Sequence, residues 1–212
     1  NMITKIGKHK VQRSDVMNGI DILMSGFQAD FLYSDPPWGQ GNLRYWQTIN
    51  KRHTGREKSD IDYAEFLPFY FNMAYKNIKD LAVIEYGVGW RSDVISVCKE
   101  SGFTHHGVYT SRYGSAAKLL PLDVHIISKS GTFKMPDEAY FTEKCYELRG
   151  QKLVSFIFDY LLPKDAELIL DPMCGMGYTA QATVDKGLIF YGNELNEKRL
   201  EKTIVRLSKD CK

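Results

Sequence analysis

The fold is decided by the stretch Leu168-Ile-Leu-Asp-Pro-Met-Cys-Gly-Met-Gly-Tyr-Thr-Ala180. It runs from a short apolar segment through two glycines into a helical pattern, which is typical of a strand, a tight turn and a helix. A second apolar segment, 188–193, precedes Glu194, which lies 19 residues after Gly175. A carboxylate at this spacing can bind ribose hydroxyls. The unit therefore predicts a β-α-β element that binds an adenosine group.

The glycines alone do not identify the cofactor. The pattern Gly175-x-Gly177-x-x-Ala180 also fits the dinucleotide fingerprint, and a Gly-x-Gly turn can simply cap a helix. Only 18 residues follow Glu194, too few for the second half of a dinucleotide fold. We therefore expect the remaining strands to precede the turn, which favours S-adenosylmethionine over NAD.

Length and composition indicate one ordinary globular domain over residues 1–212, with 43% hydrophobic and 25% charged residues. No apolar run approaches the ~20 residues of a membrane span, so we expect a cytoplasmic protein. The four cysteines fit neither a disulfide framework nor a metal site, and we expect no metal. A net charge of +2 neither requires nor excludes a nucleic-acid partner.

Short strand-like and longer helix-like segments alternate along the chain, which predicts an α/β fold. The predicted strands are 9–13, 30–33, 81–86, 105–110, 123–128, 167–170 and 188–193. The predicted helices are 15–24, 63–77, 93–101, 153–162, 179–186 and 197–208. Residues 39–59 and 130–148 are predicted to be loops, and loops of this length are usually functional or mobile. Both are candidate substrate loops.

The second decisive stretch is Asp35-Pro36-Pro37-Trp38, which directly follows a predicted strand. The prolines fix the backbone, which leaves the Pro36 carbonyl to accept a hydrogen bond beside the Asp35 carboxylate. With the indole of Trp38, these groups suit the exocyclic amine of a flat base. Two hydrogen bonds from the amine would favour a tetrahedral nitrogen whose lone pair points at a methyl sulfonium.

These residues resemble the permuted β group of DNA amino-methyltransferases, in which the catalytic motif precedes the cofactor loop, and the resemblance covers nearly the whole chain. It implies a class I methyltransferase-like fold, with a seven-stranded, mostly parallel sheet, one antiparallel strand near the end of the permuted order, and helices on both faces. It implies catalytic roles for Asp35, Pro36, Pro37 and Trp38. The cofactor-binding residues that it implies are Asp15, Asp35, Lys152, Asp171, Pro172, Met173, Cys174, Gly175, Met176, Gly177, Thr179, Asn193, Glu194 and Leu195.

The segment after the catalytic motif carries basic and aromatic side chains, which suit phosphate contacts and base stacking. Its candidate nucleic-acid contacts are Arg44, Tyr45, Trp46, Lys51, Arg52 and Arg56. A solvated surface loop would show the same composition. Residues 130–148 could form a small reading element or a dimer contact.

The leading hypothesis is a DNA methyltransferase acting on adenine N6, because related cytosine-N4 enzymes more often carry Ser at the position of Asp35. Cytosine N4 and adenine in RNA are the alternative substrates. The chain lacks an insertion large enough for a usual target-recognition domain, which leaves its sequence specificity open. A homodimer and a restriction or recognition partner also stay open. A non-catalytic nucleic-acid-binding subunit is the alternative from another class.

Overall fold

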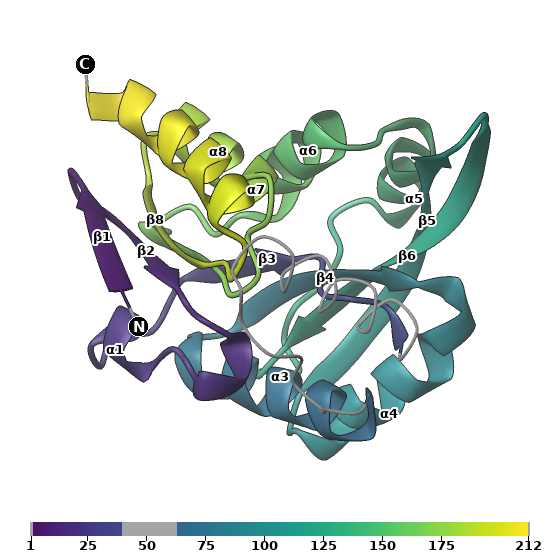
Figure 1. Cartoon of the computed structure of the whole chain (residues 1–212). Coiled ribbons are helices and arrows are strands. Elements are labelled where there is room, and N and C mark those ends of the chain that lie inside the picture. Colours follow the sequence, from purple (N-terminus) through teal and green to yellow (C-terminus); the bar gives the residue numbers. More distant parts are fainter. Residues whose placement is uncertain (1, 40–62, 212) are drawn as a thin grey trace.

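The computed structural model describes residues 2–39 and 63–211. Eight strands form one mixed sheet in the order β1-β2-β8-β7-β3-β4-β6-β5 (Figure 1). The strands are β1 (Met2–Ile6), β2 (His9–Arg13), β3 (Phe31–Ser34), β4 (Leu81–Gly87), β5 (Thr104–Ser115), β6 (Lys118–Ser128), β7 (Leu168–Asp171) and β8 (Ile189–Asn193). The pairs from β2 through β8, β7 and β3 to β4 are parallel, whereas β1–β2, β4–β6 and β5–β6 are antiparallel.

This sheet differs from the expected one in two respects. It has eight strands rather than seven, because Met2–Ile6 forms an edge strand that pairs with β2 through a turn at Gly7, where φ is +58°. Most β1 side chains are exposed, so this segment lacks the apolar run that marks a buried strand. In addition, two strands, β1 and β6, run antiparallel to the others rather than one.

Helices cover both faces of the sheet, as predicted (Figure 1). One face holds α1 (Asp21–Met24), α3 (Tyr63–Asn77) and α4 (Arg91–Glu100), and the other holds α5 (Glu138–Glu147), α6 (Gln151–Leu161), α7 (Tyr178–Asp185) and α8 (Glu197–Ser208). Short 3-10 turns lie at Val16–Asn18, Val88–Trp90 and Lys209–Cys211. No helix in the two described ranges combines the length and apolar character needed to span a membrane.

Successive side chains of the central strands point to opposite faces of the sheet and form two apolar layers. Phe31 and Tyr33 of β3 point toward α6, where the Phe31 ring meets Phe158 edge-on at 5.4 Å between centroids. Leu32 points to the opposite face and packs in the cluster formed by α1, α3 and α4. Because both faces of β3 are covered, its end is held rigidly at the centre of the sheet.

Two local predictions were wrong. The predicted helix 15–24 is divided at Gly19, where φ is +81°, into a 3-10 turn and the short α1. The predicted loop 130–148 contains α5 in its second half. Asp137 caps this helix by accepting from the amide of Tyr140 at 3.0 Å, and Phe141 and Cys145 are buried against α6.

Candidate active site

A cleft of about 580 Å³ opens where β3 and β7 lie side by side. The chain leaves β3 toward β4 on one side and β7 toward β8 on the other, so this is the point at which the strand order reverses. In open α/β sheets the crevice at the carboxyl ends of such strands is the usual ligand site. The two decisive stretches of the sequence therefore meet in one cleft.

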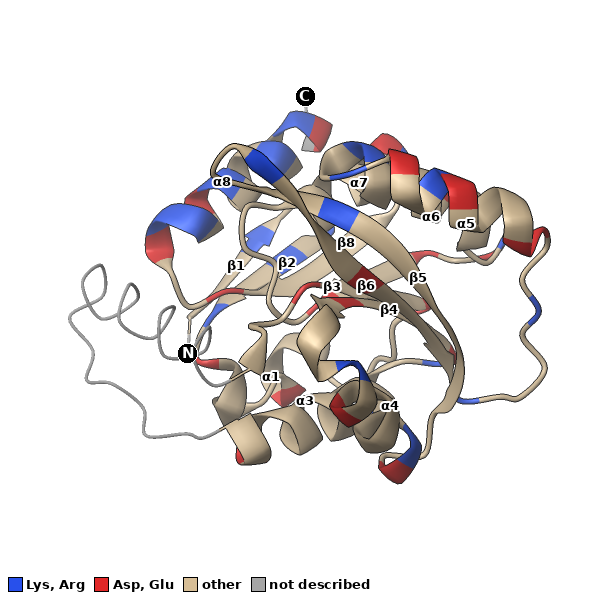
Figure 2. Cartoon of the chain, turned by 90° about the vertical axis from the view of Figure 1, so that its right-hand side faces the viewer, with Lys and Arg blue, Asp and Glu red and all other residues tan. Residues whose placement is uncertain are grey.

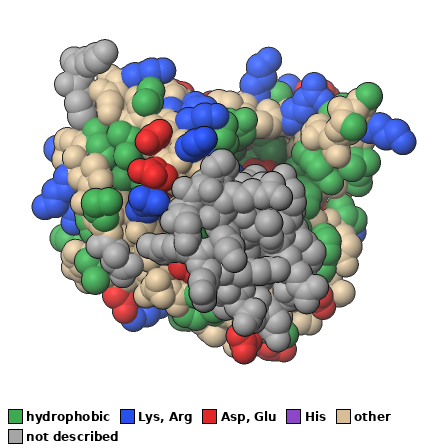
Figure 3. Space-filling view, in the orientation of Figure 1, with side chains coloured by type: hydrophobic (Ala, Val, Ile, Leu, Met, Phe, Trp, Pro, Cys, Tyr) green, Lys and Arg blue, Asp and Glu red, His purple; other side chains and the backbone are tan. Residues whose placement is uncertain are grey.

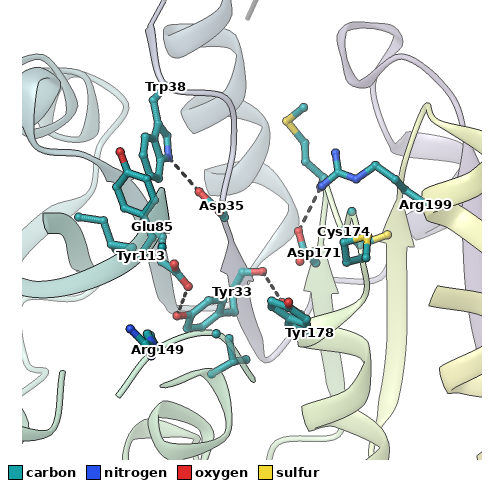
Figure 4. A pocket seen from close by; sticks show the side chains of 18 of the residues that line it. Tyr33, Asp35, Trp38, Glu85, Tyr113, Arg149, Asp171, Cys174, Tyr178 and Arg199 are labelled. Carbon is teal, nitrogen blue, oxygen red and sulfur yellow. Dashed lines mark hydrogen bonds between the residues drawn. The ribbon is translucent and has the colours of Figure 1, made fainter. Parts of the chain in front are cut away.

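The residues after β3 form one wall of the cleft. The indole Nε1 of Trp38 donates to Asp35 Oδ1 at 2.9 Å, which turns the carboxylate and the ring toward each other (Figure 4). The Tyr86 hydroxyl donates to the Pro37 carbonyl at 2.7 Å and accepts from the Gly39 amide at 3.2 Å. This tyrosine on β4 thus fixes the turn that presents Asp35.

A second aromatic ring lies next to Trp38. Tyr113 of β5 meets the indole edge-on at 4.9 Å between ring centroids, and both rings line the cleft. The predicted strand 105–110 stops short of Tyr113, whereas β5 continues to Ser115. The longer hairpin with β6 therefore adds an aromatic surface that the sequence pattern did not identify.

Among the described residues, three carboxyl groups line the cleft: Asp35, Glu85 and Asp171. Asp35 is exposed to the cleft, yet the walls withdraw enough water to raise its pKa to about 6. Desolvation by burial likewise raises the pKa of Asp171 to about 7. Desolvation, followed by the nearby Asp35 charge, raises the pKa of Glu85 to about 8. All three carboxyls therefore hold a proton more tightly than they would in water.

Sequence reasoning missed Glu85. The residue interrupts the apolar strand β4, and the register places it beside Asp35, because Ser34 pairs with Ile84. The Tyr33 hydroxyl donates a short hydrogen bond to Glu85 Oε2. The signal in the sequence that could have identified Glu85 as a site residue is an acidic side chain inside an otherwise apolar strand.

The glycine turn after β7 is held from behind by the end of β8. Glu194 accepts from the Gly175 amide at 3.0 Å through Oε1 and from the Asn196 amide at 2.9 Å through Oε2. The Asn193 side chain donates to the Pro172 carbonyl at 3.2 Å and to the Ser14 carbonyl at 3.1 Å. These bonds fix the turn that faces the cleft.

The two glycines of the turn are required by helix packing as well as by its backbone. Their φ angles are +50° at Gly175 and +88° at Gly177. A Cβ on Gly177 would lie 2.8 Å from Thr203 Oγ1, and one on Gly175 would lie 2.5 Å from Arg199 Nη2. The absence of side chains here therefore lets α8 approach the turn.

The cleft brings together many of the predicted residues but not all. Those that line it are Asp35, Trp38, Asp171, Met173, Cys174, Gly175, Met176 and Thr179. Those outside its lining are Asp15, Pro36, Pro37, Lys152, Pro172, Gly177, Asn193, Glu194 and Leu195. Asp15 caps the turn at Val16–Asn18, and Arg149 and Gly150, just before α6, line the cleft in place of Lys152. Candidate nucleic-acid contacts Arg44, Tyr45, Trp46, Lys51, Arg52 and Arg56 lie outside the described residues.

Basic groups accompany the carboxyls. Arg112, Arg149 and Arg199 line the cleft, and none of the three is among the predicted cofactor ligands. Acidic positions lie in the central part of the sheet, whereas many Lys and Arg positions lie on α8 and on β1 and β2 (Figure 2). Basic side chains also gather along the upper edge of the face shown in Figure 3. Within the described part of the chain, no group of three or more His, Cys, Asp or Glu side chains could hold a metal ion.

The chain is similar to known proteins in structure but not detectably in sequence. No family model and no curated protein matches the chain. The structure of M1.HpyAVI in complex with SAM matches with a TM-score of 0.68 and 15% identity, over 93% of this chain and 98% of that protein. TTHA0409 of Thermus thermophilus, provisionally described as a DNA modification methylase and complexed with S-adenosyl-L-methionine, matches with a TM-score of 0.65 and 15% identity, over 95% and 94%.

A third similar structure is the PvuII DNA methyltransferase, which is cytosine-N4-specific. It matches with a TM-score of 0.62 and 13% identity, over 93% of this chain and 86% of that enzyme. The coverage is nearly complete in all three pairs, so the likeness concerns the whole domain and not one β-α-β unit. The chain therefore has a methyltransferase-like α/β fold.

Proposed function

We propose that this protein transfers a methyl group from S-adenosylmethionine to an exocyclic amino group of a base in DNA, and that the group is N6 of adenine. The observation that carries the proposal is the meeting of Asp35 and Trp38 with residues 173–176 of the glycine turn in one cleft. The similar structures support it, since one is the PvuII DNA methyltransferase and two are complexes with this cofactor.

The residues present fit the cofactor. When bound, S-adenosylmethionine supplies an electrophilic methyl group on a sulfonium. A cleft of about 580 Å³ lies within the usual range for small-molecule sites. The carboxyl of Asp171 and the guanidinium groups of Arg149 and Arg199 match a ligand that carries both an ammonium and a carboxylate.

The remaining predicted cofactor contacts keep the roles that the resemblance implies. In our proposal residues 173–177 wrap the cofactor, and Glu194 binds the ribose while its two bonds to backbone amides hold the turn. Asp15, Lys152, Pro172, Thr179, Asn193 and Leu195 support this arrangement from the adjoining segments. A carboxylate oxygen accepts more than one hydrogen bond, so both tasks of Glu194 are compatible.

The base would enter the other half of the cleft. Asp35 and the Pro36 carbonyl accept hydrogen bonds from the target amine, and Trp38 stacks on the ring. Asp35 need not be a strong base, because the amine becomes acidic once it is methylated and can lose its proton late. Much of the rate comes from holding the nitrogen in line with the methyl group.

Cytosine N4 is the second candidate acceptor, because one similar structure is a cytosine-N4-specific enzyme. Adenine is our first choice because the motif begins with Asp35. Residues 39–59 would supply phosphate and base contacts. A homodimer or a separate recognition subunit would supply further contacts to the DNA.

The direct test is to incubate the protein with labelled S-adenosylmethionine and, separately, unmethylated duplex DNA, single-stranded DNA and RNA. Mass spectrometry of the nucleosides then identifies the product. N6-methyladenine in DNA is the expected result. N4-methylcytosine would correct the base, methylated RNA would correct the polymer, and no product despite measurable cofactor binding would contradict the proposed activity of the isolated chain.

Substitution of Asp35 by Ala tests the catalytic assignment. We expect Asp35→Ala to abolish methyl transfer because the amine loses its acceptor, while calorimetry still detects cofactor binding. Asp165→Ala is the matched control, since Asp165 is exposed and lies outside the cleft lining. Activity of Asp35→Ala comparable with that of the control would contradict the assignment.

A further inference from the structure

Glu85 is the carboxyl group in the cleft for which the proposed mechanism has no use. It lies on β4, next to Asp35 across the sheet, and lines the same cleft (Figure 4). Its side chain is half-buried, and Val83 and Ile84, which precede it on the strand, are buried. An acidic group in such a position costs stability unless it has a partner or a task.

The surroundings of Glu85 favour its neutral form. It lies near the carboxyls of Asp35 and Asp171, so a charge on Glu85 would be repelled by both. The neighbouring phenol donates its hydrogen to Glu85 Oε2. A proton held by Glu85 therefore belongs on Oε1, where it makes the side chain a hydrogen-bond donor.

We propose that Glu85 acts as a neutral carboxylic acid that donates a hydrogen bond to the ring nitrogen next to the target amine, which is N1 in adenine. This inference rests on the proposed function and adds a specificity-determining residue to it. Asp35 accepts from the amine and Glu85 donates to the adjacent nitrogen, so the two side chains match an N–C–NH2 edge. A keto base presents a carbonyl and an N–H at these positions and would meet the wrong partner at both.

Base analogues test the contact directly. Oligonucleotides carry the mapped target either as adenine or as 1-deazaadenine, in which N1 is replaced by C–H. For the wild-type protein we expect kcat/KM to be roughly tenfold lower on the analogue, the effect of one hydrogen bond in a desolvated site. If the product proves to be N4-methylcytosine, 3-deazacytosine takes the place of this analogue.

Two variants of Glu85 separate donation from other roles. The methionine side chain of Glu85→Met is similar in length to glutamate but cannot donate a hydrogen bond. Its kcat/KM on adenine should therefore be roughly tenfold lower than that of the wild type, with little further decrease on the analogue. Glu85→Gln keeps a neutral donor in its amide, so it should retain most of the activity and the preference for adenine. Glu100→Gln is the matched control, because Glu100 is exposed at the end of α4. Cofactor binding by each variant reports whether it has folded.

The outcomes distinguish this inference from the proposed function. The ratio of kcat/KM on adenine to kcat/KM on the analogue is compared between the two proteins. If this ratio is equal in the wild type and in Glu85→Met, the proposed role of Glu85 is overturned, while the proposed methyl transfer is unaffected. A folded Glu85→Gln as inactive as Glu85→Met would also overturn it, because an ionised base would then be required. If Glu85→Met does not fold, the wild-type ratio still decides, since an unchanged ratio excludes the contact. Absence of any methylated nucleoside from the wild-type protein would overturn both proposals.

Discussion

Asp35 and Glu85 carry the same functional group, but their surroundings give them different protonation states. Asp35 accepts from the Trp38 indole and feels the positive charge of Arg199, and both effects lower its pKa against desolvation. Desolvation, followed by the charges of Asp35 and Asp171, raises the pKa of Glu85 further, and the hydrogen bond from the Tyr33 phenol offsets only part of this rise. When the surroundings separate the pKa values of two neighbouring carboxyls in this way, one commonly acts as an acid and the other as an acceptor.

A bell-shaped pH dependence follows for kcat/KM. Activity should rise as the pH passes about 6, because Asp35 must lose its proton to accept from the amine, and fall above about 8, because Glu85 then loses the proton that it donates. Other titratable or charged groups around Glu85 are Tyr33 on β3, Asp171 on β7, Cys145 on α5, Arg112 and Tyr113 on β5, and Arg149 before α6. Initial rates at low substrate between pH 5 and 10 measure both limbs.

The variant Glu85→Gln isolates the alkaline limb of this profile, because an amide does not titrate. We expect the fall above pH 8 to disappear while the rise near pH 6 stays, since Asp35 is unchanged. Persistence of the alkaline fall in Glu85→Gln would assign that fall to a group other than Glu85.

At the scale of elements, the glycine turn joins β7, α7 and α8. Gly177→Ala should lower the free energy of unfolding by about 1–3 kcal/mol, because its φ is +88° and the new Cβ would lie 3.1 Å from Thr203 Cα, which is backbone. Urea unfolding measures this change. Gly131→Ala is the control, because a Cβ there meets nothing within 4 Å. Equal unfolding free energies for the two variants would contradict the packing role of the turn.

The elements with a clear hydrophobic period were predictable, and those without it were not. The strands and helices around the glycine turn have continuous apolar faces, and the two motifs that end β3 and β7 pointed to the cleft. The edge strand β1 is mostly exposed, and α5 buries only Phe141 and Cys145, so neither carries a strong pattern. Glu85 and Tyr113 escaped prediction because their roles depend on which strands become neighbours, and a single sequence does not encode that order visibly.

At the scale of the whole molecule, the sheet order turns distant segments into one site. β3 and β7 are far apart in the sequence but adjacent in the sheet, and their ends bring Asp35 and Asp171 to opposite sides of one crevice. Parallel pairing makes both strands end at the same edge. As a result, several carboxyls share a poorly hydrated space, which lowers the free energy of unfolding of the whole domain.

This destabilisation predicts how stability depends on pH. A folded-state pKa of about 8 for Glu85, against an ordinary value of 4.5, means that the folded protein keeps a proton that the unfolded chain has lost. The free energy of unfolding should therefore fall as the pH rises from about 4.5 toward 8, and Glu85→Gln should reduce this slope by at most about 1.4 kcal/mol per pH unit. Urea unfolding of both proteins from pH 5 to 9 measures the difference.

Comparison of the two proteins at each pH removes contributions that they share. His105 and His125 are held neutral in the folded protein, since burial lowers the pKa of each to about 4, so they act in the opposite direction and weaken the fold as the pH falls. Because both proteins contain these histidines, the histidine contribution cancels when the two free energies of unfolding are subtracted at each pH, and the contribution of Glu85 remains. Parallel stability curves for wild type and Glu85→Gln would show that Glu85 titrates alike in the folded and unfolded chains, and its proposed donor role at neutral pH would fail with it.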